Sequence, residues 1–307
     1  MGFWNQDLRL GCVQYASYPG ADGKALVDAV TRLCTDVMFE VLEITRISDY
    51  DTRKEIKRIL DVSEMTVVFS GGPVYINEQI QLGSLDRSVR QDSLDKAKRL
   101  ANEAIEMGAI IHLVGSGSDP GEKYRMAALP YLAESLVILC DYIKVNAPGS
   151  MLVSMEPFDR EVTYRALVGP TDDAVLVAKE VKKCVDNFGL TFDLSHLAQL
   201  GEEPSISVKE AASYIVHAHL ANCYLQDATH PSYGDKHVRF GFPGSSVNEE
   251  IIADFLESMY RNGLFKKGRI PVSIEVKPQP GEEPDIVLSA AKRSFLRAWQ
   301  VYELRRK

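Results

Sequence analysis

The sequence predicts an α/β fold, a single (β/α)8 barrel that occupies residues 1–307. Short apolar, β-branched runs alternate with segments of helical periodicity from one end of the chain to the other, giving eight of each. No linker, low-complexity tract or change of composition interrupts this order, and the length suits one barrel. A doubly wound open sheet would carry a GxGxxG turn after its first strand, where this chain reads YASYPGADG. The alternation therefore favours the closed barrel.

The predicted strands are short and rich in valine, isoleucine, leucine and threonine; they are Leu10–Tyr15, Val41–Thr45, Thr66–Ser70, Ile110–Val114, Leu152–Glu156, Thr191–Asp193, Ile215–Leu220 and Val272–Val276. The predicted helices place apolar residues three and four apart, with charges on the other side; they are Ala25–Thr35, Thr52–Leu60, Asp95–Met107, Tyr124–Val145, Asp172–Asn187, Val208–Tyr214, Glu249–Asn262 and Pro284–Leu304. We expect Asp92 and Ser93 to cap the third helix, and Gly189 and Gly263 to end the fifth and seventh.

Composition and charge narrow the classes of function. A net charge of −8 disfavours nucleic acid as a partner, because an acidic surface repels phosphate. The five cysteines are scattered and form no CxxC pair, which is typical of reduced thiols in a cytosolic protein. The start MGFWNQDLRL does not resemble a signal peptide, and no apolar run approaches the roughly 20 residues of a membrane span. We therefore expect a cytoplasmic protein with no membrane partner.

Four successive predicted strands carry a metal-binding residue type at their C-terminal ends, where the active site of such a barrel lies. These residues are Glu156 in MLVSMEPF, Asp193 in LTFD, His219 in IVHAHLAN and Glu275 in VSIEVKP. A lone carboxylate or imidazole in an apolar run is costly unless it is paired or coordinated. Because four neighbouring strands contribute one residue each, the sequence predicts that together they bind one divalent metal ion.

Three carboxylates and one imidazole form an oxygen-rich donor set. This set favours Mn²⁺, with Mg²⁺, Co²⁺ or Zn²⁺ as alternatives, and it differs from structural zinc sites, which use thiolates or more histidines. Taken singly, each residue has a simpler interpretation. Glu156 alone could cap a helix or pair with an arginine, and Asp193 could be the N-cap of a short helix.

Other polar residues inside the predicted strands have structural interpretations. His217 lies two residues before His219 and faces the same side of the strand, one layer deeper. We therefore expect His217 to be a buried, hydrogen-bonded residue that supports the ligands. We expect His112 to pack internally and Glu43 to support the ligands from strand two.

At these positions the sequence resembles the xylose isomerase-like TIM barrels of the sugar-phosphate isomerase/epimerase superfamily. The family pattern is a Glu after strand five, an Asp-x-x-His after strand six, a His-x-His on strand seven and a Glu on strand eight. Here the matching residues are Glu156, Asp193 with His196, His217 with His219, and Glu275. The resemblance spans the whole barrel and is strongest from residue 150 onward.

The resemblance implies roles for several residues. In keto-sugar epimerases of this kind the four ligands hold Mn²⁺ or a similar ion, and the two glutamates exchange protons with a substrate carbon. Glu156 and Glu275 are then the catalytic acid/base pair. By the same resemblance His196 contacts a substrate hydroxyl, and Arg239 resembles the positively charged residue that follows strand seven. The chemistry is consistent, because removing a proton beside a carbonyl develops oxygen charge that a bound cation stabilises.

The segment HPSYGDKHVRFGFPG, residues 230–244, departs from this pattern. It places Asp235 and His237 two residues apart, as in endonuclease IV-type barrels, where such a pair helps to bind a further metal ion. Those enzymes need additional histidines on early strands, whereas strands two and three here read EITR and VVFSGGP. We interpret Asp235 and His237 as substrate-binding or auxiliary acid/base residues, with a second metal ion as the alternative.

The expected function is a divalent-metal-dependent isomerase or epimerase of a small-molecule carbohydrate, a keto-sugar or sugar phosphate. The alternative is a metal-dependent lyase on an oxidised sugar, either a keto-polyol dehydratase or a C-glycoside deglycosidase that works with a small partner subunit. An endonuclease IV-like phosphodiesterase and a non-catalytic barrel with a structural metal ion are further alternatives. Members of the family are often dimers or tetramers, so the resemblance is compatible with a homo-oligomer.

Overall fold

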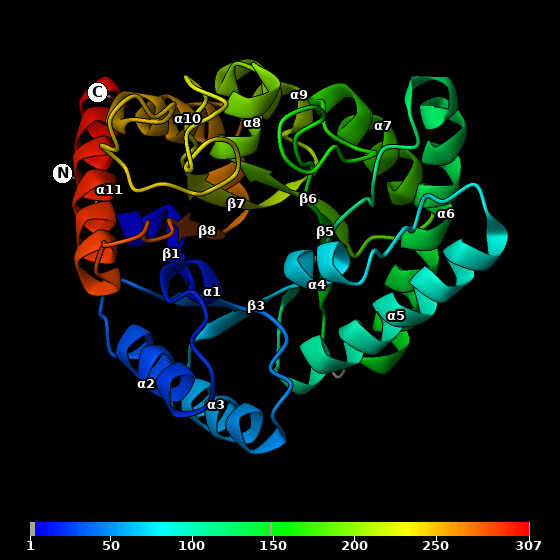
Figure 1. Cartoon of the computed structure of the whole chain (residues 1–307), viewed down its shortest axis with the longest axis horizontal. Helices are drawn as coiled ribbons and strands as arrows, with labels where there is room; N and C mark the ends of the chain where they lie inside the picture. Colours follow the sequence, from blue (N-terminus) through cyan, green and yellow to red (C-terminus); the bar gives the residue numbers. More distant parts are fainter. Residues whose placement is uncertain (1–3, 148, 307) are drawn as a thin grey trace.

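Eight parallel strands close into a barrel at the centre of the molecule (Figure 1). The structure, a computed structural model, describes residues 4–147 and 149–306. Strands that follow one another in the chain pair side by side, and β1 pairs with β8 to complete the closure. The strands are β1 Leu8–Val13, β2 Val41–Ile44, β3 Thr66–Ser70, β4 Ile111–Val114, β5 Leu152–Met155, β6 Phe188–Asp193, β7 Ile215–Ala221 and β8 Ile270–Glu275. The predicted TIM barrel is thereby confirmed.

A ring of helices surrounds the barrel (Figure 1). The longer helices are α2 Gly23–Cys34, α3 Tyr50–Ser63, α5 Arg87–Glu106, α6 Glu122–Asn146, α7 Thr171–Lys182, α9 Pro204–Ala211, α10 Glu249–Arg261 and α11 Pro284–Arg306. Short helical turns connect them to the strands; they are η1 Trp4–Gln6, α1 Gln14–Ser17, α4 Gly72–Asn77, α8 Leu194–Leu200 and η2 Leu264–Lys267. Apolar side chains of the helices and of the outward faces of the strands form one continuous core.

The interior of the barrel changes from apolar to polar along the strands. A separate buried apolar cluster consists of Val41, Val68, Ile111 and Leu113 from β2, β3 and β4. Glu43 lies two residues after Val41, so its side chain faces the same side of β2, closer to the C-terminal end of the strand. Buried polar side chains therefore collect at the C-terminal end of the barrel.

Several element boundaries differ from the prediction, among them those of β1, α7 and β6. β1 ends at Val13, because Gln14–Ser17 form a helical turn. α7 ends at Lys182, and Gly189 lies inside β6 instead of ending a helix. A Cβ atom at Gly189 would lie 2.5 Å from the side chain of Val216, so glycine permits β6 and β7 to approach closely. Gly263 does follow α10 in a left-handed conformation, as expected of a helix stop.

The start of α5 was also predicted wrongly. Asp86 caps this helix, and its side chain accepts hydrogen bonds from the backbone N–H groups of Ser88 and Val89. Asp92 and Ser93 therefore lie inside the helix. The Ser93 hydroxyl is buried and accepts a hydrogen bond from the backbone N–H of the loop before α5.

Helix α6 is long and apolar enough to cross a membrane by length and composition alone. Half of its most apolar window is buried inside the protein, and it packs against α5, α7 and β5. We therefore assign α6 to the outer ring of the barrel. Its apolar character comes from burial against neighbouring elements, a common property of core helices.

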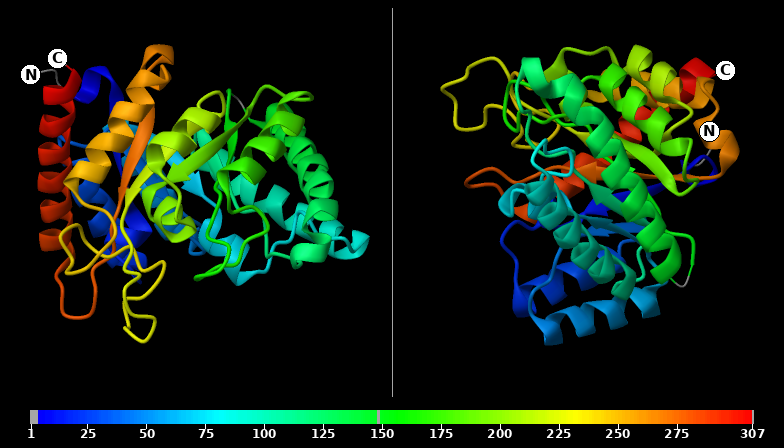
Figure 2. Two further views of the ribbon diagram at one scale, coloured as in Figure 1. Left: turned by 90° about the horizontal axis from the view of Figure 1, so that it is seen from above. Right: turned by 90° about the vertical axis from the view of Figure 1, so that its right-hand side faces the viewer.

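The loops that follow β7 and β8 project from the same end of the barrel (Figure 2). They comprise residues 222–248, drawn in yellow, and residues 276–283, drawn in orange. This end carries the C-terminal ends of the strands, where the active sites of such barrels are built.

Candidate metal centre and active-site cavity

The four predicted ligands meet at the C-terminal end of the barrel. Glu156 follows β5 directly, Asp193 and Glu275 end their strands, and His219 lies in β7. One ligand atom of each residue lies within 4.8 Å of those of the other three, and all four residues are buried. Three buried carboxylates beside one imidazole are unfavourable without a positive partner. The arrangement is therefore suited to a cation.

The imidazole of His219 lies at the centre of this group. Its Nδ1 atom is 2.9 Å from Oε1 of Glu156, 3.0 Å from Oε2 of Glu275 and 3.5 Å from Oδ2 of Asp193. Ligand atoms lie about 2.0–2.2 Å from a bound metal ion, so neighbouring ligands of one ion stand roughly 3 Å apart. Burial lowers the pKa of His219, but the surrounding carboxylates raise it well above its usual value. The group therefore has the dimensions and the negative charge that one ion requires.

The two oxygens of Asp193 have different environments. Oδ1 accepts hydrogen bonds from the Ser195 hydroxyl at 2.6 Å and from the backbone N–H of His196 at 3.2 Å, so it caps α8. Oδ2 is buried without a hydrogen-bond partner among the described residues and faces His219. Burial raises the pKa of Asp193, but nearby imidazoles hold it well below its usual range. The residue is thus both a helix cap and a carboxylate whose second oxygen is free for a metal ion.

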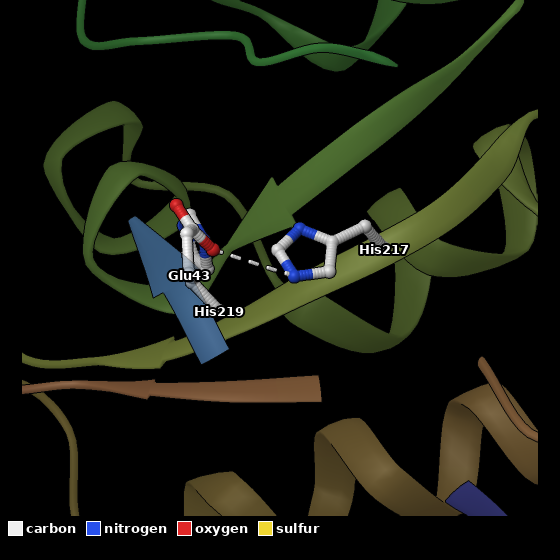
Figure 3. Close-up of side chains that lie close together, drawn as sticks. All are labelled: Glu43, His217 and His219. Carbon is white, nitrogen blue, oxygen red and sulfur yellow. Dashed lines mark hydrogen bonds and ion pairs between the residues drawn. The ribbon is translucent and has the colours of Figure 1, made fainter. Parts of the chain in front are cut away.

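Glu43 contacts the other ring nitrogen of His219, and the two side chains lie together in Figure 3. Oε2 of Glu43 lies 2.9 Å from Nε2 of His219. A proton on Nε2 that is donated to this carboxylate leaves the lone pair of Nδ1 directed at the other ligands. The hydroxyl of Tyr15 donates to Oε1 of Glu43 at 3.3 Å and to Ser70 at 2.9 Å. Glu43 thus has the supporting position expected of it.

His217 points toward Glu43 (Figure 3) and takes part in a buried hydrogen-bond chain. Its Nδ1 is 3.3 Å from the Thr191 hydroxyl, and its Nε2 is 3.2 Å from the Ser273 hydroxyl and 3.6 Å from Glu43. Burial lowers the pKa of His217 to about 3, so the ring is neutral. Because both ring nitrogens have protein partners, His217 supports the site, as predicted.

A cavity of about 320 Å³ opens above the four ligands. Glu156 and Glu275 line it, together with His196, Asp235 and His237 from the predicted substrate-binding set. Tyrosines, a phenylalanine, a lysine and smaller side chains form the other walls; they come from the loops after β1, β3, β5 and β8. A hollow of this size suits a small molecule.

Two features of the cavity bear on proton transfer. Burial raises the pKa of Glu156 to about 6, while His219 lowers it. A carboxylate in the wall of a cavity can accept a proton from a molecule bound there and return one to it. The ring of His196 stacks at 4.8 Å on that of Phe158, and its Nε2 is 3.9 Å from Oε1 of Glu156. His196 therefore stands beside the carboxylate, in reach of a molecule bound there.

Asp235 and His237 form a second buried pair at the edge of the cavity. Nε2 of His237 is 3.2 Å from Oδ2 of Asp235 and 3.6 Å from Oε1 of Glu275. Burial lowers the pKa of His237, but the two carboxylates raise it to about 10. Gln199 donates to Oδ1 of Asp235 at 2.8 Å. His237 has φ of +47°, which is uncommon for a residue with a side chain, and its Nδ1 is buried without a hydrogen-bond partner among the described residues.

The sequence matches a known family over residues 24–287, and the description of that family is xylose isomerase-like TIM barrel. The chain belongs to the xylose isomerase-like TIM barrel family. The family resemblance that the strand-end motifs indicated is thus confirmed. No curated relative matches the sequence significantly.

Several solved structures share this fold over nearly the whole chain. A D-tagatose 3-epimerase-like protein has a TM-score of 0.70 at 17% identity, covering 98% of this chain and 100% of its own. An L-ribulose 3-epimerase has a TM-score of 0.72 at 14% identity, covering 97% and 96%. An IolI protein with a bound zinc atom has a TM-score of 0.73 at 14% identity, covering 96% and 99%. At these identities the likeness shows the fold alone.

In this xylose isomerase-like barrel, Arg239 lies apart from the other predicted site residues. Its Nε donates to Oε1 of Glu282 at 2.8 Å, and its guanidinium lies over the ring of Phe242. It is absent from the residues that line the cavity, unlike His196 and Asp235.

Several cavity residues were not predicted. Tyr15 follows β1 directly, and Lys277 lies two residues after Glu275, so position at a strand end could have indicated both. Tyr164, also in the cavity wall, and Gln199, which donates to Asp235 behind it, carried no such signal, because they lie in a loop and a helix whose paths depend on packing. His112 on β4 is buried, with Nδ1 3.3 Å from a backbone carbonyl of β3, and it does not line the cavity.

Proposed function

We propose that this protein is a divalent-metal-dependent isomerase or epimerase of a keto-sugar or sugar phosphate. The observation that carries the proposal is the position of Glu156 and Glu275. Both carboxylates lie within 3.0 Å of Nδ1 of His219, and both line the cavity. An epimerase needs two bases at one carbon, one to remove the proton and one to return it from the other face. The names of the structural neighbours, which include epimerases of keto-sugars, support the same chemistry.

The ligands we propose for the metal ion are Glu156, Asp193, His219 and Glu275, and the ion we propose is Mn²⁺, with Mg²⁺, Co²⁺ or Zn²⁺ as alternatives. The unpartnered, buried Oδ2 of Asp193 supports a cation at this point, and three oxygen donors favour a hard ion. When bound, the ion supplies the positive charge that stabilises an oxygen anion beside the carbon that loses its proton.

The protein's own residues account for the rest of the proposed reaction. One of Glu156 and Glu275 removes the proton next to the ketone, and the other delivers a proton to the opposite face. His196, Asp235 and His237 hold substrate hydroxyls, because their polar atoms surround the same cavity. The rings of Phe158 and Tyr164 pack against the ring of His196, with centroids 4.8 Å and 6.2 Å away, and give that wall an aromatic surface.

A metal-dependent lyase on an oxidised sugar is the second candidate, and the position of His237 favours it. This imidazole lies 3.6 Å from Glu275 and has a buried Nδ1 without a partner among the described residues. A proton donor beside the base could protonate a leaving oxygen or carbon after the first proton is removed. If the substrate is a C-glycoside, we expect the enzyme to work with a small partner subunit. No comparable observation among the described residues favours an endonuclease IV-like phosphodiesterase or a non-catalytic barrel with a structural metal ion.

Proton exchange with solvent tests the proposal. Protein loaded with Mn²⁺ is incubated in D₂O with neutral ketohexoses and their phosphates, and the carbon beside the ketone is followed by NMR. We expect deuterium to enter that carbon and an epimer or isomer to form, whereas a lyase would also release water or an aglycone.

Glutamine variants connect the exchange to the site. We expect Glu156→Gln and Glu275→Gln to slow it by about 10²-fold or more, the usual contribution of a general base. Glu161→Gln is the matched control, because Glu161 is exposed in the loop after β5. Full turnover in both site variants would contradict the assigned roles, and no exchange with any ketose would contradict the proposed function.

A further inference from the structure

A second hollow adjoins the active-site cavity. It has a volume of about 720 Å³ and lies between the start of α2 and the loops that follow β7 and β8. Lys277 lines both hollows, so the two spaces meet at its side chain. The cavity of about 320 Å³ is large enough for a simple sugar. A substrate that fills both hollows would carry an additional group next to Lys277.

Two lysines at this junction have no ionic partner. Lys236 and Lys277 both line the second hollow, both are exposed, and neither ammonium lies within 4.0 Å of a carboxylate among residues 4–147 and 149–306. The neighbouring acidic residue does not neutralise them, because Glu282 pairs with Arg239 and accepts a hydrogen bond from the backbone N–H of Gln279. The junction is therefore a small region of uncompensated positive charge on an acidic protein.

The two loops that carry these lysines are joined by hydrogen bonds. The backbone N–H of Lys277 donates to the carbonyl of His237 at 2.6 Å. The amide of Gln279 donates to the carbonyls of Lys236 at 3.2 Å and Lys277 at 3.1 Å. Prolines on both sides restrict the backbone further; they are Pro231, Pro278, Pro280 and Pro284. The two lysines therefore stand on a backbone that is held in place, side by side.

The position of Lys277 relative to the acid/base residues defines which part of a substrate it can reach. Lys277 lies two residues after Glu275, beyond the end of β8, and it lines both hollows. Its side chain therefore stands where the two hollows meet, within reach of the far end of a sugar chain that extends from one into the other. Inside the cavity an anionic group would meet Glu156, Glu275 and Asp235, and these carboxylates would repel it.

We propose that Lys277 and Lys236 bind an anionic group, a phosphate or a carboxylate, at the end of the substrate remote from the reacting carbon. The inference rests on the proposed function and adds the substrate class: a keto-sugar that bears a terminal negative charge. The lysines act as specificity-determining residues and take no part in proton transfer. The prolines and Tyr18 form an apolar wall around the remainder of the group.

Binding measurements on the full chain loaded with Mn²⁺ test this assignment. Isothermal titration calorimetry compares a neutral ketohexose, its 6-phosphate and a ketohexuronate. We expect at least one of the two anionic sugars to bind about tenfold tighter than the neutral sugar, the effect of one charge-assisted interaction. The preference should shrink as the salt concentration rises, because these lysines are exposed to solvent. A preference for the phosphate or for the uronate identifies which anion the site accepts.

Substitutions of single lysines show which residue causes the preference for an anionic sugar. We expect Lys277→Gln to reduce the ratio of anionic to neutral affinity about tenfold, and Lys236→Gln to reduce it by less. Lys54→Gln, on the exposed face of α3, is the matched control and should leave the ratio unchanged. If the neutral sugar exchanges its proton and neither anionic sugar binds better, the inference fails and the proposed function stands. If none of the three sugars binds, both fail.

Discussion

Asp193 allows metal binding to be separated from helix capping. Its Oδ1 caps α8, and its Oδ2 faces the ligand nitrogen of His219. Asp193→Asn keeps an acceptor oxygen for the cap and places a neutral amide group where the anionic oxygen stands. Asp193→Ala removes both. We therefore expect the asparagine variant to lose its response to metal ions and to keep the stability of α8.

The expected size of the effect follows from the length of the chain. A ligand at a hundredfold excess over its Kd stabilises a folded protein by about 2.7 kcal/mol. An unfolding entropy of about 2.1 cal/mol/K per residue amounts to roughly 0.64 kcal/mol/K for 307 residues. Mn²⁺ should thus raise the Tm of the wild type by about 4 °C and that of both variants by less than about 1 °C. Loss of a cap worth about 1 kcal/mol should place the metal-free alanine variant about 1.5 °C below the asparagine variant.

Differential scanning calorimetry with EDTA and with excess Mn²⁺ measures both quantities. Asp28→Asn, on the exposed face of α2, is the control for loss of one carboxylate and should show the wild-type response. A metal response of about 4 °C in Asp193→Asn would refute the ligand assignment. Equal metal-free Tm values for the two Asp193 variants would refute the capping role.

Three further predictions follow from other parts of the barrel. Glu43→Gln should weaken Mn²⁺ binding about 10- to 100-fold by calorimetric titration, because the carboxylate that orients His219 is lost; unchanged affinity would contradict this role. Burial lowers the pKa of His112 to about 4, so the unfolded chain takes up this proton first as the pH falls. The contribution of His112 to the free energy of unfolding should therefore be fully present above about pH 6.5 and should decrease by roughly 3 kcal/mol as the pH falls to about 4. Urea titrations at these two pH values should show a smaller decrease for His112→Gln than for the wild type. Gly189→Ala should lower the free energy of unfolding by about 1–3 kcal/mol, because its Cβ would meet Val216 at 2.5 Å, and an unchanged urea midpoint would contradict that.

The fold and the grouping of the four proposed ligands could be predicted because both depend on local periodicity. A strand alternates its side chains between two faces, and a parallel barrel gathers the C-terminal ends of its strands at one end. Polar residues at the ends of successive apolar runs, such as Asp193 and Glu275, must therefore approach one another. The same reasoning placed His217 one layer below His219, where the structure has it.

Pairing between loops could not be predicted. Arg239 pairs with Glu282, 43 residues farther along the chain, and the sequence offers many other acidic residues that would suit an exposed guanidinium equally well. The start of α5 failed for a related reason. Asp86 and Asp92 are both good cap residues by type, and the choice between them depends on how residues 87–93 pack against the barrel.

The contact between Glu43 and His219 joins residues 176 positions apart in the chain. A half-barrel of β1–β4 contains the glutamate without any of the four proposed ligands, and a half-barrel of β5–β8 contains all four proposed ligands without the carboxylate that contacts His219. The two halves of this barrel are therefore not interchangeable modules. Recombination with half-barrels of relatives would have to preserve this one pairing, and metal affinity would report directly whether a recombined chain has closed correctly.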